Sequence, residues 1–122
     1  MTWNTMLSGI AVAAFAASVS CSATPAAAQS FDCGAASLSS EKAVCASARL
    51  SGLDERMSSL YDKLMTSLKR DDQREGLRDY QMRFLATRNR CGRNAGCITG
   101  AYLDQIDVLK MRIRYVEARW DQ

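Results

Sequence analysis

The sequence predicts an all-α fold: a small antiparallel bundle of three long helices plus one short N-terminal helix, held by two disulfides. Three observations lead to this prediction. Apolar residues recur at helical spacing from Ser40 onward. Glycine is sparse, and the one proline, Pro25, lies near the N-terminus. Four of the five cysteines follow that N-terminal segment in two closely spaced pairs.

The N-terminal segment has the features of a secretory signal peptide. An apolar, alanine-rich stretch from Leu7 to Val19 is followed by three alanines at 26–28, a small-residue cleavage site. The stretch is shorter than the roughly 20 apolar residues that span a bilayer, so we predict no transmembrane helix. We expect residues 1–28 to be a signal peptide, residues 29–122 to form one domain, and the protein to be periplasmic or secreted.

Cys21 indicates a second processing route, because bacterial lipoproteins are cut immediately before a cysteine that then carries the lipid. Ser18 departs from that pattern, since a bulky aliphatic residue is expected three positions before the cysteine. Membrane association is expected only if Cys21 is lipidated.

Cleavage after residue 28 leaves Cys33, Cys45, Cys91 and Cys97. Four cysteines permit three pairings, and the local one, Cys33 with Cys45 and Cys91 with Cys97, fits the helical pattern best. Outside the cytosol such thiols oxidise. Metal binding is not expected, because the chain contains no histidine and no C-x-x-C motif.

Four helices are predicted, at about 41–46, 48–69, 74–90 and 98–120, with 70–73 as a polar connection. Ser39 or Ser40 is the expected cap of the first helix and Ser47 of the second. The second helix carries an apolar stripe of Leu50, Leu53, Met57, Leu60, Leu64 and Leu68. The third presents Leu77, Tyr80, Phe84 and the aliphatic part of Arg88. The last has a seam of Tyr102, Ile106, Leu109, Ile113, Val116 and Trp120, which is suited to packing along another helix.

The residues that usually perform catalysis are missing. Without histidine, a serine nucleophile lacks its usual base. The carboxylate pairs Asp54–Glu55, Asp71–Asp72 and Asp104–Asp107 are interpreted as solvated acids among arginines, and not as an acid and base facing each other across a cleft. We predict no enzymatic activity and no cofactor.

The net charge of +3 comes from 16 basic and 13 acidic residues that are interspersed, so no nucleic-acid partner is indicated. Four basic residues on the last helix, Lys110, Arg112, Arg114 and Arg119, are read as a solvated face. The alternative is weak binding to an anionic polymer or lipid.

The segment from Cys91 to Cys97 is the strongest candidate for a binding role. It is polar, glycine-rich and constrained at both ends, with Arg93 and Asn94 at its tip and Arg90 nearby. A pre-organised loop loses little entropy on docking. We therefore predict Arg90, Arg93 and Asn94 as binding residues, and the alternative is a hairpin link without a partner.

Several spaced residues resemble the LprI-like lysozyme inhibitor domain of exported bacterial proteins, from Ser30 to about Leu109. They are Phe31-Asp32-Cys33, Glu41-Lys42-Ala43-Val44-Cys45, Leu50, Leu53-Asp54, Tyr61, Gln81, Arg88, Cys91, Cys97, Tyr102, Ile106 and Leu109. Phe84 stands where this family usually has tryptophan, and Gln105 where arginine is common.

The resemblance implies a helical envelope protein that inhibits lysozyme. In this hypothesis the protein occludes the glycosidase cleft without catalysis, and its partner is a lysozyme or another envelope protein. The alternative from a different class is an envelope-associated structural protein that pairs through its helical seam.

Overall fold

The computed structural model describes residues 30–120, and in that range the chain is helical without any strand. The predicted signal peptide and Cys21 lie outside the described residues. A short 3-10 helix, η1 (Cys33–Ala35), precedes the four α-helices α1 (Ser39–Ala46), α2 (Ala48–Ser67), α3 (Asp71–Arg90) and α4 (Ala95–Trp120). The all-α prediction is confirmed.

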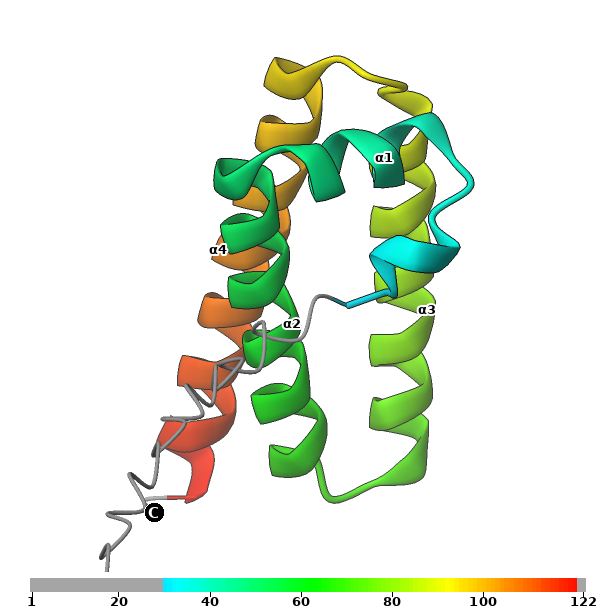
Figure 1. Cartoon of the computed structure of the whole chain (residues 1–122). Coiled ribbons are helices and arrows are strands. Elements are labelled where there is room, and N and C mark those ends of the chain that lie inside the picture. Colours follow the sequence, from blue (N-terminus) through cyan, green and yellow to red (C-terminus); the bar gives the residue numbers. More distant parts are fainter. Residues whose placement is uncertain (1–29, 121–122) are drawn as a thin grey trace, which may run out of the picture.

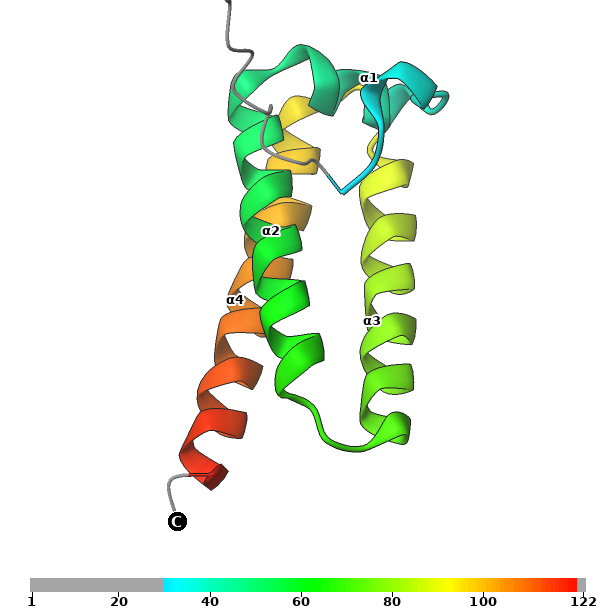
Figure 2. The ribbon, with the colours of Figure 1, turned by 60° about the horizontal axis from the view of Figure 1, so that its bottom comes forward.

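The three long helices lie with α2 and α4 side by side in the same direction and α3 running the opposite way (Figure 1). The short α1 crosses the end of the molecule at which α3 passes into α4, and the turn from α2 to α3 forms the other end. The view in Figure 2 shows the same neighbours. The principal packing is therefore between α2 and α4.

Two disulfides are present, Cys33–Cys45 and Cys91–Cys97, with Cα–Cα distances of 5.8 and 5.6 Å. The predicted local pairing is confirmed. The first bridge fastens η1 to α1, and the second joins the end of α3 to the first turn of α4. Closing loops this short is worth about 2–3 kcal/mol each in the chain-entropy model.

The core contains most of the predicted apolar stripes, but Tyr80 is not part of it, and the side chain of Trp120 lies outside what the structure describes. Its buried members are Val44, Leu50, Met57, Leu64, Leu68, Leu77, Phe84, Ile98, Tyr102, Ile106, Leu109 and Ile113. Leu53, Leu60 and Val116 lie at its margin. The seam of α4 is thus filled by the chain's own helices as far as Ile113. This argues against the alternative that the seam pairs with a separate helix.

The starts of α3 and α4 each differ by three residues from the sequence-based ranges. α3 begins at Asp71 and not near residue 74, because the polar run supplies a helix start: its two aspartates suit the positive end of the helix dipole. Gln73 Oε1 also accepts a hydrogen bond from the backbone amide of Arg70 (3.3 Å). α4 begins at Ala95 and not at Ile98, because Asn94 caps it. Both connections are therefore shorter than predicted.

The predicted cap of α1 was wrong. Neither Ser39 nor Ser40 precedes the helix; Ser40 is buried inside it and bonds to Asn89 Oδ1 (3.0 Å). Glu41 instead turns back, and its Oε2 accepts hydrogen bonds from the backbone amides of Ser37 and Leu38 (3.0 and 3.1 Å). At α2 the prediction holds, since Ser47 Oγ accepts from Leu50 N (3.3 Å).

Gly52 offers a direct test of this account of α2. It lies in the helix interior with an ordinary helical backbone, and a Cβ built there meets nothing within 4 Å. We expect Gly52→Ala to raise the free energy of unfolding by about 1 kcal/mol, because glycine has the larger conformational entropy to lose. Urea unfolding measures this. A destabilised variant would mean that α2 is not continuous at this position.

Candidate functional site

The Cys91–Cys97 segment is a tight corner between two helices. Cys91 follows the last residue of α3, and Gly92 has a φ of 57°, the left-handed conformation that glycine adopts without strain. Gly92 therefore ends α3 without backbone strain. The disulfide then spans the corner and reaches Cys97 inside the first turn of α4.

The three predicted binding residues lie in different environments. Arg93 is exposed, and no hydrogen bond or ion pair joins its side chain to another residue within 30–120. Asn94 is exposed too, but its Oδ1 accepts the backbone amide of Cys97 (2.9 Å), so it caps α4. Arg90 donates to Thr87 Oγ1 (3.1 Å) on its own helix. All three side chains are exposed, and of the three Arg93 is the one without a described side-chain partner.

A buried polar network lies directly beneath this corner. The Tyr102 hydroxyl on α4 donates to Asp54 Oδ1 on α2 (2.8 Å) and accepts from Arg88 Nη1 on α3 (3.3 Å). Asp54 and Tyr102 are 0% exposed and Arg88 is 2% exposed. Burial raises the pKa of Tyr102, so its hydroxyl stays protonated and remains a donor to Asp54.

Further residues complete the network from the N-terminal side. Ser30 donates its backbone amide and its hydroxyl to the two carboxylate oxygens of Asp54 (2.6 and 2.7 Å). The ring of Phe31 lies against the Arg88 guanidinium, 5.2 Å from Cζ to the ring centre. Arg88 also donates twice to Asn89 Oδ1 (3.1 and 2.8 Å). Glu41 Oε1 on α1 lies 3.8 Å from Arg88 Nη2, so all four helices and the segment before η1 meet at Arg88 and Asp54.

This network fixes the direction of the Cys91–Cys97 corner. Arg88 stands three residues before Cys91, and Tyr102 five residues after Cys97, so one hydrogen bond closes the hairpin below the disulfide. The hydrogen bond between Arg88 and Tyr102 holds the base of the corner, and the Cys91–Cys97 disulfide spans its middle. What remains free to reach a partner is the Arg93 side chain.

Asp54 was misassigned from the sequence, since we interpreted the Asp54–Glu55 pair as solvated. A signal was present: Asp54 is four residues after Leu50 and three before Met57, on the buried face of α2. Arg88 was likewise expected to bury only its aliphatic part, but its guanidinium is enclosed as well. Arg88 also lines a pocket, together with Glu41 and Tyr61.

The two positions that depart from the family pattern both lie inside the molecule. Phe84 packs on Tyr102 with ring centres 5.3 Å apart. Gln105 is 3% exposed and donates to Gln81 Oε1 (2.9 Å), while Gln81 donates to the sulfur of Met57 (3.2 Å). Gln105 is therefore part of the packing between α3 and α4, and not a surface group available to a partner.

Most of the basic residues predicted as the solvated face of α4 have intramolecular contacts. Lys110 pairs weakly with Asp107 (3.9 Å), Arg112 lies over the ring of Tyr80 (4.4 Å), and Arg119 donates to the Tyr115 hydroxyl (2.8 Å). Arg114 is exposed.

Among residues 30–120, no three Cys, Asp or Glu side chains are grouped so that they could hold a metal ion. No helix in the same range is long and apolar enough to cross a membrane.

A comparison with protein families matches residues 33–122 to the family described as Lysozyme inhibitor LprI. The chain belongs to this family. The matched region of LprI type contains both disulfides and the Asp54–Tyr102–Arg88 network, which supports the resemblance seen in the sequence. No curated protein and no solved structure matches the chain.

The network of this LprI-family chain predicts a large loss of stability on removal of Arg88. Arg88→Met keeps the length of the side chain but removes the donor to the Tyr102 hydroxyl, and it leaves Glu41 without its ion-pair partner (3.8 Å). We expect the free energy of unfolding to fall by about 3 kcal/mol. Urea unfolding measures this, with Arg56→Met on the exposed face of α2 as a control expected to change it by less than about 0.5 kcal/mol. Equal effects of the two variants would contradict the role given to Arg88.

The hydrogen bonds that the Glu41 carboxylate accepts predict that the protein loses stability in acid. The backbone amides of Leu38 and Ser37 hold the pKa of Glu41 below its ordinary value of 4.5, and the charge of Arg88 acts in the same direction. Because the folded-state pKa is the lower one, the stabilisation is complete above 4.5 and is lost as the pH falls through the folded-state value.

Glu41→Gln should therefore flatten the decline in stability below about pH 4.5. Asp72, whose pKa is lowered by its hydrogen bond with Arg70, contributes in both proteins, so the difference between them isolates Glu41. The measurement is urea unfolding at a series of pH values. Parallel curves for wild type and variant would disprove the assignment.

Proposed function

We propose that this chain is an exported envelope protein that inhibits lysozyme by placing the Cys91–Cys97 corner in the substrate cleft, without catalysis. Membership in the LprI family supports the activity. The structural observation that carries the mechanism is Arg93, an exposed cation at the tip of a disulfide-closed corner with no described intramolecular partner.

The chemistry of the target fits a cation at this position. Glycosidases cleave with two carboxyl groups that face each other across the cleft. A guanidinium donates to a carboxylate in a planar, bidentate geometry. Arg93 would therefore compete with substrate for the acidic groups of the cleft.

Rigidity supports the same mechanism. Ordering a loop on binding costs free energy, and a loop already fixed in its bound shape avoids much of that cost. Here the disulfide, the Asn94 cap and the bond between Arg88 and Tyr102 fix the corner in advance. The affinity then depends on few contacts, with Arg93 as the central one.

Location in an oxidising compartment outside the cytosol is part of the proposal. Two disulfides of this kind persist where thiols are not kept reduced. The net charge of +3 gives no long-range attraction to a cationic lysozyme, so association would rest on contact at the corner.

The test is inhibition of lysozyme in a cell-wall clearing assay. The oxidised protein should slow clearing, and Arg93→Ala should raise the inhibitory concentration by about 30-fold, the effect of losing one central contact residue. Arg114→Ala is the matched control, since it removes an exposed arginine at the opposite end of α4.

A second variant separates shape from charge. Cys91→Ser/Cys97→Ser keeps Arg93 but frees the corner, and it should weaken inhibition while the remaining disulfide and the core keep the helices folded. Circular dichroism checks the fold. The proposal fails if no lysozyme type is inhibited, or if Arg93→Ala and Arg114→Ala inhibit alike.

A further inference from the structure

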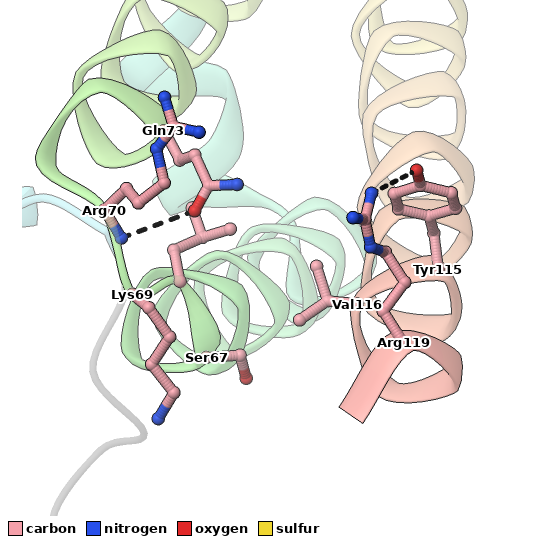
Figure 3. A pocket seen from close by; sticks show the side chains of 8 residues that line it. Ser67, Lys69, Arg70, Gln73, Tyr115, Val116 and Arg119 are labelled. Carbon is pink, nitrogen blue, oxygen red and sulfur yellow. Dashed lines mark hydrogen bonds between the residues drawn. The ribbon is translucent and has the colours of Figure 1, made fainter. Parts of the chain in front are cut away.

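At the end of the molecule opposite the Cys91–Cys97 corner, a hollow lies between the last turns of α4 and the turn that joins α2 to α3 (Figure 3). The hollow has two adjoining lobes of about 340 and 330 Å³ that share Leu68, Gln73, Tyr115 and Val116. In Figure 3, Val116 points from α4 toward the end of α2, and Arg70 and Lys69 lie across from Arg119.

The rim of this hollow is cationic. Lys69, Arg70, Arg112 and Arg119 line it, and neither lobe is lined by an acidic residue. Two of the four are held in place, since Arg119 donates to the Tyr115 hydroxyl (2.8 Å) and Arg112 lies 4.4 Å from the centre of the Tyr80 ring. Arg70 is bound by Asp72 just outside the hollow (2.9 and 2.6 Å).

The surrounding charge has the same sign. Segments 63–78 and 110–119 together contain nine Lys or Arg and four Asp or Glu, an excess of five, whereas the net charge of the whole chain is +3. The rest of the sequence is therefore slightly acidic. The one acid of 110–119, Glu117, is paired with Lys63 (2.7 Å).

The floor of the hollow is apolar. It consists of Leu64, Leu68, Leu77 and Val116, at the end of the core. Two large apolar side chains of the same part of α4 are exposed, Tyr115 at 62% and Met111 at 55%. An apolar floor inside a ring of cations is complementary to a molecule that has hydrocarbon next to an anionic group.

We propose that this basic hollow binds anionic phospholipid at a membrane surface, with the phosphate among Lys69, Arg112 and Arg119 and the upper acyl chain against Leu68 and Val116. Soluble polyanions and inorganic phosphate offer the charge without the hydrocarbon. Bound in this way, the molecule would stand with the Cys91–Cys97 corner directed away from the membrane, since the two features occupy opposite ends.

The test is co-sedimentation with vesicles, using protein purified from the exported fraction with its N-terminus determined. Binding is expected to vesicles of phosphatidylcholine mixed with phosphatidylglycerol and not to phosphatidylcholine alone. Arg112→Gln/Arg119→Gln should weaken it by roughly 25-fold, about fivefold per cation at an anionic surface. Tyr115→Ser should also weaken it, and circular dichroism confirms that each variant is folded.

The control is Arg90→Gln/Arg93→Gln, which lowers the net charge equally but at the other end and should keep binding within about twofold of wild type. Equal weakening by the two double variants would overturn the proposal, because it would show an effect of net charge alone. Full competition by glycerol phosphate or heparin would overturn it as well. So would self-association that Arg112→Gln/Arg119→Gln abolishes, because the occupant would then be a second copy.

Discussion

The hydrogen bonds that join Arg88, Tyr102 and Asp54 constrain everything else in this structure. They bring a cation of α3 and an anion of α2 together through a hydroxyl of α4, in a region that water does not reach. Another packing of the helices that kept these groups buried but apart would leave unpaired charges in an apolar interior, which is costly. The network therefore favours one arrangement of the helices. Burial of leucines alone would not select it, because that burial is non-directional.

The same network connects the fold to the proposed activity. Arg88 lies at the base of the Cys91–Cys97 corner, so the element that orders the helices also orients Arg93. At the opposite end the polar contacts lie on the surface, as between Lys63 and Glu117, and α4 ends beside an apolar hollow ringed by cations. The end with the Cys91–Cys97 corner therefore has a fixed shape, whereas the end with the hollow offers positive charge to a partner.

Local patterns predicted the helices well, because apolar spacing decides which face of α2 and α4 is buried. They failed where a side chain bonds to a distant or backbone partner. Glu41 replaced the expected serine cap, and Asn94 started α4 early. Ser40 bonds to Asn89, 49 residues away, and Ser30 to Asp54, 24 residues away. Such long-range hydrogen bonds form only in the assembled fold, so hydrophobic periodicity does not predict them.

The two disulfides each link cysteines that are near in sequence, 12 and 6 residues apart. Short loops close at little entropic cost, so each sulfur meets its correct partner often even in an unfolded chain. Oxidation can then precede tertiary assembly, and mispaired intermediates are disfavoured without help from the core. The disulfides can thus fix two corners early in folding. The packing of the core and the buried charges then determine how α2, α3 and α4 are arranged.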